Sequence, residues 1–149
     1  MAQIPKHVEK IIFLAFVVAA VWYEFGPKGE PEGDLIAQAD VMSLQSGTGA
    51  IPESACALYR DALTAGNRLG AWHFADCIAQ SMRGSASDRR ALQYAVLSLA
   101  LDAQVGGVTG RQKREALHAT PEEVKRADAI DVITVLKTQG VPDPAQLQQ

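Results

Sequence analysis

The sequence predicts an all-α protein: a short solenoid of antiparallel helix pairs behind an N-terminal transmembrane helix. Between residues 55 and 82, apolar side chains recur at helical spacing in two runs, which Gly66 and Asn67 separate. The same unit recurs 36 residues later, where Ala91 takes the place of Ala55. A period in the mid-thirties is typical of stacked helix pairs. We identify no convincing strand in the chain.

The composition limits the classes of partner. The chain has 149 residues, a formal net charge of −3 and 48% apolar residues, which suits one domain of ordinary size. A chain without an excess of basic residues gives no argument for nucleic-acid binding. We therefore expect no nucleic-acid partner, and the weak net charge excludes little else.

Residues 1–25 carry a membrane signal. An uninterrupted apolar run of 13 residues extends from Ile11 to Tyr23. As a helix it spans about 20 Å, which is short of a hydrocarbon core of about 30 Å, so flanking residues would have to complete the span. The predicted membrane span includes Ile11, Phe13, Phe16, Val18, Trp22 and Tyr23.

Two interpretations of this segment stay open. In the first it is a retained signal anchor, with Trp22 and Tyr23 at the far membrane interface. In the second it is a cleaved signal peptide, with Val18 and Ala20 before the cleavage site. Because the aromatic pair follows Ala20 so closely, we favour the anchor.

The charges around the apolar run predict its orientation. Lys6 and Lys10 precede the run, whereas the residues after it are mainly acidic and include only Lys28 as a base. Basic residues stay on the cytoplasmic side. We therefore expect a single-pass membrane protein with a cytoplasmic N-terminus and with the helical domain on the far side of the membrane.

The elements after the anchor can be placed in order. Residues 26–33, with three glycines and two prolines, predict a linker. Asp34 is the expected N-cap of the first helix, which continues to Leu44. After the central helix pair, Asp88 is the expected cap of a strongly apolar helix, and we place the end of that helix at Gly106-Gly107.

The last part of the domain contains a strong helix start. After a short helix near residues 111–117, Thr120 and Glu123 form a capping box with Pro121 in the first helical position. This pattern predicts one helix that extends to Gly140. Residues 141–149 are polar and rich in proline and glutamine, and we expect them to be a disordered tail.

The central unit resembles a known repeat. The pattern Ala55-x-x-Leu58-Tyr59-x-x-Ala62-Leu63-x-x-Gly66 resembles the first helix of a Sel-one-like repeat, a relative of the tetratricopeptide repeat. The second helix of that repeat is matched by small and apolar side chains at Gly70, Phe74, Ala75 and Ile78. The resemblance extends from Asp34 to Ala129, within a predicted repeat domain of residues 34–140. It implies a helical scaffold that acts as an adaptor in envelope assemblies. It also implies a bacterial source, for which the membrane is the inner membrane and the helical domain is periplasmic.

The two cysteines are placed for a disulfide. Cys56 lies near the start of one predicted helix and Cys77 near the end of the next, and the point midway between them falls at the Gly66-Asn67 turn. Antiparallel helices folded at that turn bring the two cysteines opposite each other. A disulfide closing a loop of this length would stabilise the fold by roughly 3 kcal/mol. The alternative is a pair of buried free thiols.

The sequence offers few candidates for catalysis. His73, Asp76 and Cys77 lie three and four residues apart, so they could share a helix face for a nucleophile pair or a metal site. A metal site needs further ligands, and no second cluster is present in the sequence. We predict no catalytic residues, no metal and no cofactor.

An interaction module is therefore the function that we favour, as an adaptor or an accessory subunit of a larger membrane complex. An envelope enzyme using His73 or the pair Glu122 and Glu123 remains an alternative, as do a purely structural tether and a cleaved soluble periplasmic form. Tyr, Trp and Arg carry much of the binding energy at interfaces, although repeat packing would equally explain an aromatic residue. The candidate partner contacts are Tyr59, Arg60, Arg68, Trp72 and His73.

Overall fold

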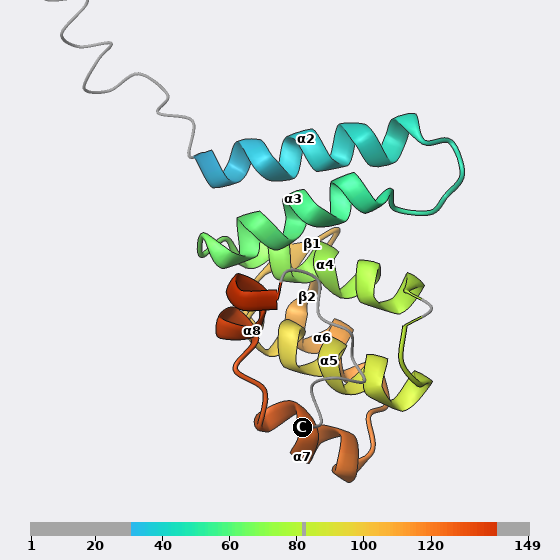
Figure 1. The fold of residues 1–149 in the computed structure, drawn as a ribbon, viewed down its shortest axis with the longest axis vertical. Helices are drawn as coiled ribbons and strands as arrows, with labels where there is room; N and C mark the ends of the chain where they lie inside the picture. The colour runs from blue at the N-terminus through green and yellow to red at the C-terminus, as the bar shows by residue number, and fades with distance from the viewer. Residues whose placement is uncertain (1–30, 82, 140–149) are drawn as a thin grey trace, which may run out of the picture. The chain divides into compact units, whose positions relative to one another are not determined.

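Helices account for most of the computed structural model, which describes residues 31–81 and 83–139 (Figure 1). The described elements are α2 (Pro31–Gln45), α3 (Glu53–Thr64), α4 (Arg68–Gln80), α5 (Ala86–Ser98), β1 (Gln104–Val105), β2 (Val108–Thr109), α6 (Gly110–Glu115), α7 (Pro121–Asp128) and α8 (Val132–Gln139). The predicted all-α class is confirmed for this part of the chain.

The predicted membrane span and the tail of residues 141–149 lie outside the described residues. Within residues 31–81 and 83–139, none of the helices combines the length and the hydropathy that a membrane crossing requires. The domain that follows residue 30 can be described by itself.

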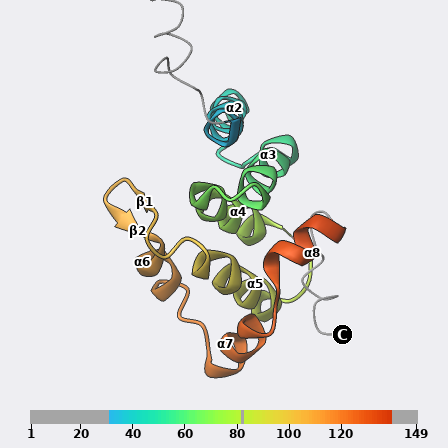
Figure 2. The same ribbon diagram turned by 90° about the vertical axis from the view of Figure 1, so that its left-hand side faces the viewer.

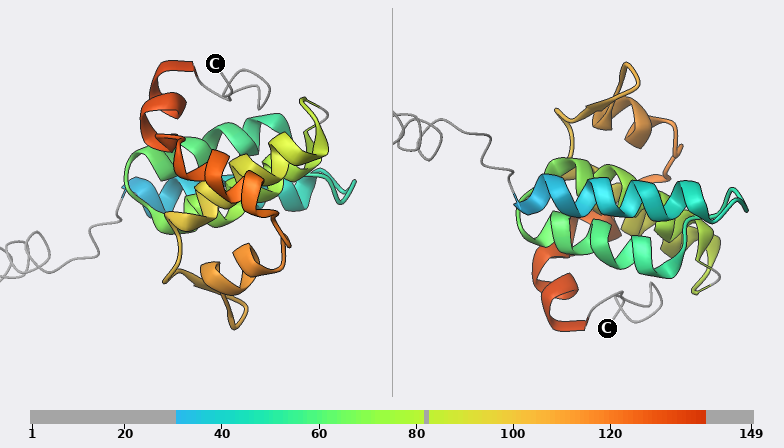
Figure 3. Two further views of the ribbon diagram at one scale, coloured as in Figure 1. Left: turned by 90° about the horizontal axis from the view of Figure 1, so that it is seen from below. Right: turned by 90° about the horizontal axis from the view of Figure 1, so that it is seen from above.

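Helices α2 to α5 form an antiparallel succession, which we call the helical stack (Figures 1 and 2). Each of its helices packs on the preceding one, while α6 and α7 pack on α5 and α8 packs on α3. The hairpin with α6 and the helix α8 lie on opposite sides of the stack (Figure 3). The core is therefore built from the facing sides of α2 to α5, closed by α7 and α8. Its large buried side chains include Tyr59, Phe74, Leu92, Leu97 and Leu136.

The turn between α3 and α4 forms as predicted. Gly66 has a φ of +105°, which a residue with a side chain rarely adopts, and the Asn67 side chain caps α4 by accepting a hydrogen bond from the backbone N–H of Leu69. Gly70 then lets the two helices approach closely. A Cβ atom at this position would lie 2.6 Å from the backbone nitrogen of Leu63 and 2.7 Å from the carbonyl oxygen of Tyr59.

Two predicted helix starts are wrong by a few residues. α2 begins at Pro31, so the last three residues of the predicted linker belong to this helix and Asp34 lies inside it. Proline is compatible with a first turn because the N–H that it lacks has no helical partner there. α5 begins at Ala86 because Ser85 is its N-cap, and Asp88 is the capping-box partner of Ser85.

The glycine pair at Gly106-Gly107 does not end a helix. α5 already ends at Ser98, and the pair forms the turn of a small antiparallel hairpin in which Val105 pairs with Val108. Both glycines have positive φ values, of +59° and +83°, as a two-residue hairpin turn requires. The prediction that the chain contains no convincing strand is therefore wrong at residues 104–109.

The final predicted helix is divided in two. The Thr120 capping box and Pro121 start α7 as expected, and α6 matches the predicted short helix. However, α7 ends at Asp128 and α8 begins at Val132. The side chain of Asp131 accepts a hydrogen bond from the backbone N–H of Thr134, 3.2 Å away, and so caps the start of a new helix.

Candidate functional site

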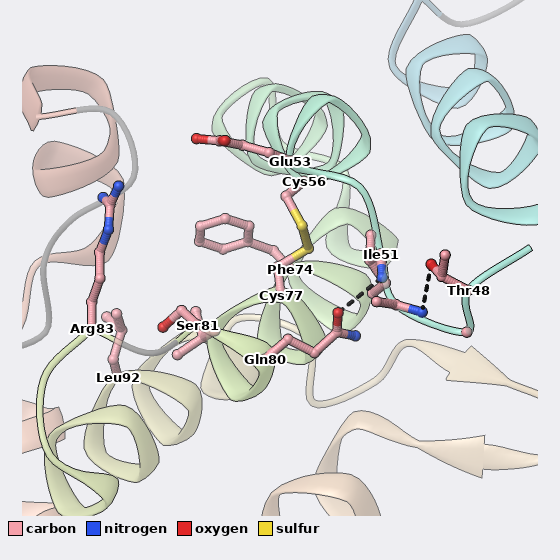
Figure 4. A pocket seen from close by; sticks show the side chains of 13 residues that line it. Thr48, Ile51, Glu53, Cys56, Phe74, Cys77, Gln80, Ser81, Arg83 and Leu92 are labelled. Carbon is pink, nitrogen blue, oxygen red and sulfur yellow. Dashed lines mark hydrogen bonds between the residues drawn. A yellow bond between two sulfur atoms is a disulfide. The ribbon is translucent and has the colours of Figure 1, made fainter. Parts of the chain in front are cut away.

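A cavity of about 870 Å³ opens beside the cysteines at one end of the α3–α4 pair (Figure 4), and we call it the disulfide pocket. Its walls come from the loop between α2 and α3, the first turn of α3, the second half of α4, the residues after α4 and the middle of α5. The lining residues are Thr48, Gly49, Ala50, Ile51, Glu53, Cys56, Phe74, Cys77, Ile78, Gln80, Ser81, Arg83 and Leu92.

The predicted disulfide between Cys56 and Cys77 is present and forms part of this wall. The Cα atoms are 5.8 Å apart, within the range that a disulfide requires. Cys77 is buried and Cys56 is half-buried. The two cysteines are therefore not free thiols, which was the alternative. Their bond ties the start of α3 to the end of α4.

The floor of the pocket is apolar and continuous with the core. Phe74, Ile78 and Leu92 line the pocket, and each of these side chains is almost fully buried. The loop wall is fixed by Gln80, whose side-chain oxygen accepts a hydrogen bond from the backbone N–H of Ile51 at 2.8 Å. Since core side chains and this hydrogen bond hold the walls, the pocket is preformed.

Two opposite charges stand at the edge of the pocket, and we call Glu53 and Arg83 the charged rim. Both residues are exposed, and neither side chain makes a hydrogen bond or an ion pair with any other described residue. In Figure 4 the Glu53 carboxylate and the Arg83 side chain both lie on the side of the pocket toward which the ring of Phe74 extends. The pocket thus combines an apolar floor with an acid and a base whose side chains have no partner in the described part of the chain.

None of the five predicted partner contacts lines the disulfide pocket. Tyr59 is 2% exposed, its ring stacks on that of His73 with the centroids 4.6 Å apart, and its hydroxyl donates a hydrogen bond to Asp40 at 2.6 Å. Burial, reinforced by this hydrogen bond, raises the pKa of Tyr59 to about 12. Its role is repeat packing, which ties α2, α3 and α4 together.

Trp72 is also covered. It is 8% exposed, and the ammonium group of Lys113 lies 4.5 Å from its ring centroid. The same ammonium group donates a hydrogen bond to Asp76 at 2.7 Å, so α6 is held against α4 by one cation. Tyr59 and Trp72 are therefore packing residues, and a direct contact of either side chain with a partner would require the domain to open.

The three remaining predicted contacts keep access to solvent. Arg60 pairs with Asp61 at 2.8 Å, and Arg68 pairs with Asp102 at 3.2 Å on the surface. His73 is half-buried, and burial lowers its pKa from the ordinary value even though two nearby carboxylates oppose the shift. The exposed pair of Arg68 with Asp102 contributes little to stability, whereas the Arg60 side chain beside Asp61 is half-buried.

The groups considered for catalysis have separate partners. Cys77 is in the disulfide, His73 stacks on Tyr59, and Asp76 pairs with Lys113. Within residues 31–81 and 83–139, no group of three or more His, Cys, Asp or Glu side chains is arranged to hold a metal ion.

Glu123 is also accounted for by the fold. It is 1% exposed, accepts two-pronged hydrogen bonds from Arg90 at 2.7–3.1 Å, and caps α7 through the backbone N–H of Thr120. Hydrogen bonding from Arg90 lowers its pKa to about 2. Glu123 therefore links α7 to α5 as a carboxylate that is ionised at neutral pH, whereas its neighbour Glu122 is exposed.

Of the residues that line the disulfide pocket, sequence reasoning singled out only the two cysteines as a candidate site, and it named Phe74 and Ile78 as packing positions of a helix. Glu53 and Arg83 are 30 positions apart and belong to no motif. Comparison with known proteins finds no family model, no curated protein and no solved structure that matches the chain.

Proposed function

We propose that the chain is a membrane-anchored interaction module of the bacterial inner membrane, which holds a Sel-one-like repeat domain in the periplasm as an adaptor or accessory subunit of a larger complex. The observation that carries this proposal is the disulfide pocket, because a preformed apolar cavity with unpaired charges at its edge suits the recognition of another molecule. Interfaces are organised in the same way, with an apolar centre and a polar rim.

The helical stack supports the repeat part of this proposal. Its consecutive antiparallel helices each contact mainly their neighbours, which is the arrangement of a solenoid. Solenoids present extended surfaces to other proteins. A stack of so few helices is near the minimum size for this architecture, and the disulfide and the returning helix α8 compensate for that.

The disulfide supports the periplasmic location. Disulfides persist in oxidising compartments such as the periplasm and are rare in the cytosol. The apolar run from Ile11 to Tyr23 and the basic residues before it predict the same side of the membrane for the helical domain. Two independent features of the chain, its cysteines and its charge distribution, thus favour one location.

Crosslinking in cells tests the proposal. A photoreactive amino acid at Thr48, an exposed lining residue, samples the disulfide pocket, and the same amino acid at exposed Lys125 on α7 is the control. We expect one reproducible protein adduct from Thr48 in the membrane fraction and none of that mass from Lys125. Equal adducts from both positions, or none from either, would contradict the proposal.

A cleaved soluble periplasmic form is the second candidate, and the small residues Val18 and Ala20 before the aromatic pair favour it. Membrane fractionation separates the two forms. A retained anchor predicts a full-length chain that alkaline carbonate does not release from membranes. A shorter chain in the soluble periplasmic fraction, with its N-terminus just after Ala20, would establish the cleaved form instead.

A further inference from the structure

We propose that α8 leaves its own domain and docks on α3 of a second copy of the chain, so that two copies exchange this helix and form a dimer. The exchange goes beyond the proposed function, because it concerns contact between two identical chains rather than with a foreign partner. Three features of the molecule support it: the surface under α8, the way in which α8 is held, and the segment that joins it to α7.

The surface under α8 already fits this helix. α8 packs mainly on α3, and its residues Val132 and Leu136, one helical turn apart, are 4% and 3% exposed. Ile133 is half-buried against the same core. A second copy has the identical helix and the identical surface on α3. Exchange therefore replaces each contact of α8 by the same contact between two chains, which is a low-cost route to a dimer.

Apolar packing alone holds the side chains of α8 in place. The side-chain hydrogen bonds of residues 131–138 stay within this segment, and none of these described side chains is hydrogen-bonded or ion-paired to another element. α7, in contrast, is joined to α5 by the ion pairs of Glu123 with Arg90 and of Arg126 with Asp88. α8 can therefore detach while α7 stays on α5, because its departure leaves no polar side chain of the stack without a partner.

The segment between α7 and α8 is compatible with a continuous helix. It consists of Ala129, Ile130 and Asp131, and residues 122–139 contain neither glycine nor proline. Ala129 is already in the right-handed helical region, with φ −85° and ψ −8°. Asp131 interrupts the helix by capping Thr134, and α8 turns back toward α3 (Figure 1). A straightened α7–α8 helix would carry α8 away from its own α3, and short connections of this kind favour exchange between copies.

Two substitutions at Asp131 separate the continuity of the helix from the loss of the cap. Asp131→Ala and Asp131→Pro both remove the capping carboxylate of an exposed residue. Alanine favours the continuous helix, whereas proline prevents it. Proline is tolerated immediately before a helix, as Pro52 before α3 shows. Both variants should therefore fold, which circular dichroism checks.

The oligomeric state provides the first measurement. The full chain in a mild non-ionic detergent is analysed by size-exclusion chromatography with light scattering over a range of concentrations. We expect a dimer fraction that rises with concentration. The dimerisation constant should increase roughly tenfold or more in Asp131→Ala, because the closed form loses its cap and the continuous helix loses nothing. Asp131→Pro should stay monomeric.

Photocrosslinking then decides whether α8 is the exchanged element. A photoreactive amino acid replaces Ile133 in chains of light and heavy isotopic composition, which are mixed and equilibrated before illumination. Crosslinked peptides from the separated monomer and dimer are identified by mass spectrometry. We expect peptides that join α8 of one isotopic composition to α3 of the other in the dimer, and none of them in the monomer.

Three results would overturn the exchange of α8. They are a dimerisation constant that Asp131→Ala leaves unchanged, equal dimerisation of the two Asp131 variants, and a dimer in which α8 is joined only to its own α3. The crosslink from Thr48 tests the proposed function separately, because the disulfide pocket contains no residue of α8. Failure of one proposal is thus distinguishable from failure of the other.

Discussion

Removal of the Cys56–Cys77 disulfide should destabilise the helical domain by an amount that the loop length predicts. The two cysteines are 21 positions apart. The chain-entropy relation for a loop of this size gives about 11 cal/mol/K, which corresponds to about 3 kcal/mol at 25 °C. That is a large part of the 5–15 kcal/mol that stabilises a typical domain.

Urea unfolding of the full chain, followed by circular dichroism in a mild non-ionic detergent, measures this loss. Three samples are compared: the oxidised protein, the same protein reduced by a phosphine, and the double variant Cys56→Ala with Cys77→Ala. The reduced protein isolates the effect of the bond because its side chains are unchanged, and the variant adds the small effect of truncating the sulfur atoms. A loss below about 1 kcal/mol in the reduced protein would refute the argument that chain entropy governs this contribution.

Three further substitutions test the packing. Gly70→Ala should lower the free energy of unfolding by roughly 1–3 kcal/mol, because the added carbon would meet backbone atoms of α3 at 2.6–2.7 Å; an unchanged urea midpoint would contradict this close approach. Glu123→Gln should lower the free energy of unfolding by about 1–3 kcal/mol at pH 7. The difference in free energy of unfolding between this variant and the wild type should shrink as the pH falls from about 4.5 to about 2. The folded state lowers the pKa of Glu123 to about 2, so the carboxylate stabilises the fold fully above this window and loses its effect within it. A difference that does not depend on pH would argue against the ion pair with Arg90. His73→Gln should flatten the dependence of stability on pH below 6.5, because burial lowers the pKa of His73 and the unfolded state binds the proton more readily; an unchanged pH profile would contradict the burial of the imidazole.

Local signals predicted the elements whose geometry depends on neighbouring residues. The Thr120 capping box, the Gly66-Asn67 turn and the pairing of Cys56 with Cys77 all follow from side chains within a few residues or from the symmetry of one helix pair. These features need no knowledge of the remaining chain. They therefore appear in the structure as the sequence predicts.

The predicted helix boundaries are wrong where one residue type is typical of two different local structures. Glycine pairs end helices and also form hairpin turns, and only the pairing of Val105 with Val108 decides between them at Gly106-Gly107. The apolar spacing after Pro121 continues across Asp131, so periodicity alone does not show that this aspartate caps a new helix. The Asp131-x-x-Thr134 pattern was the signal that could have indicated the break.

The disulfide pocket could not be predicted from local patterns. Its walls come from five segments, and Glu53 and Arg83 line one cavity only after α3, α4 and α5 have packed. Residue type alone also does not distinguish a partner contact from a packing residue. Tyr59 and Trp72 have the chemistry of interface residues, but the same aromatic rings fill the space between helices of the stack.

The most direct test of the central claim is to purify the tagged chain, after crosslinking in cells, from solubilised membranes with the disulfide pocket open or blocked. Ala50→Trp places a large side chain at an exposed lining position, and Ala129→Trp places the same side chain at an exposed position beyond α7. We predict one partner in fixed ratio with the wild type and with Ala129→Trp, and its loss with Ala50→Trp. Undiminished recovery of that partner with Ala50→Trp, or a chain that is purified alone, would contradict the account.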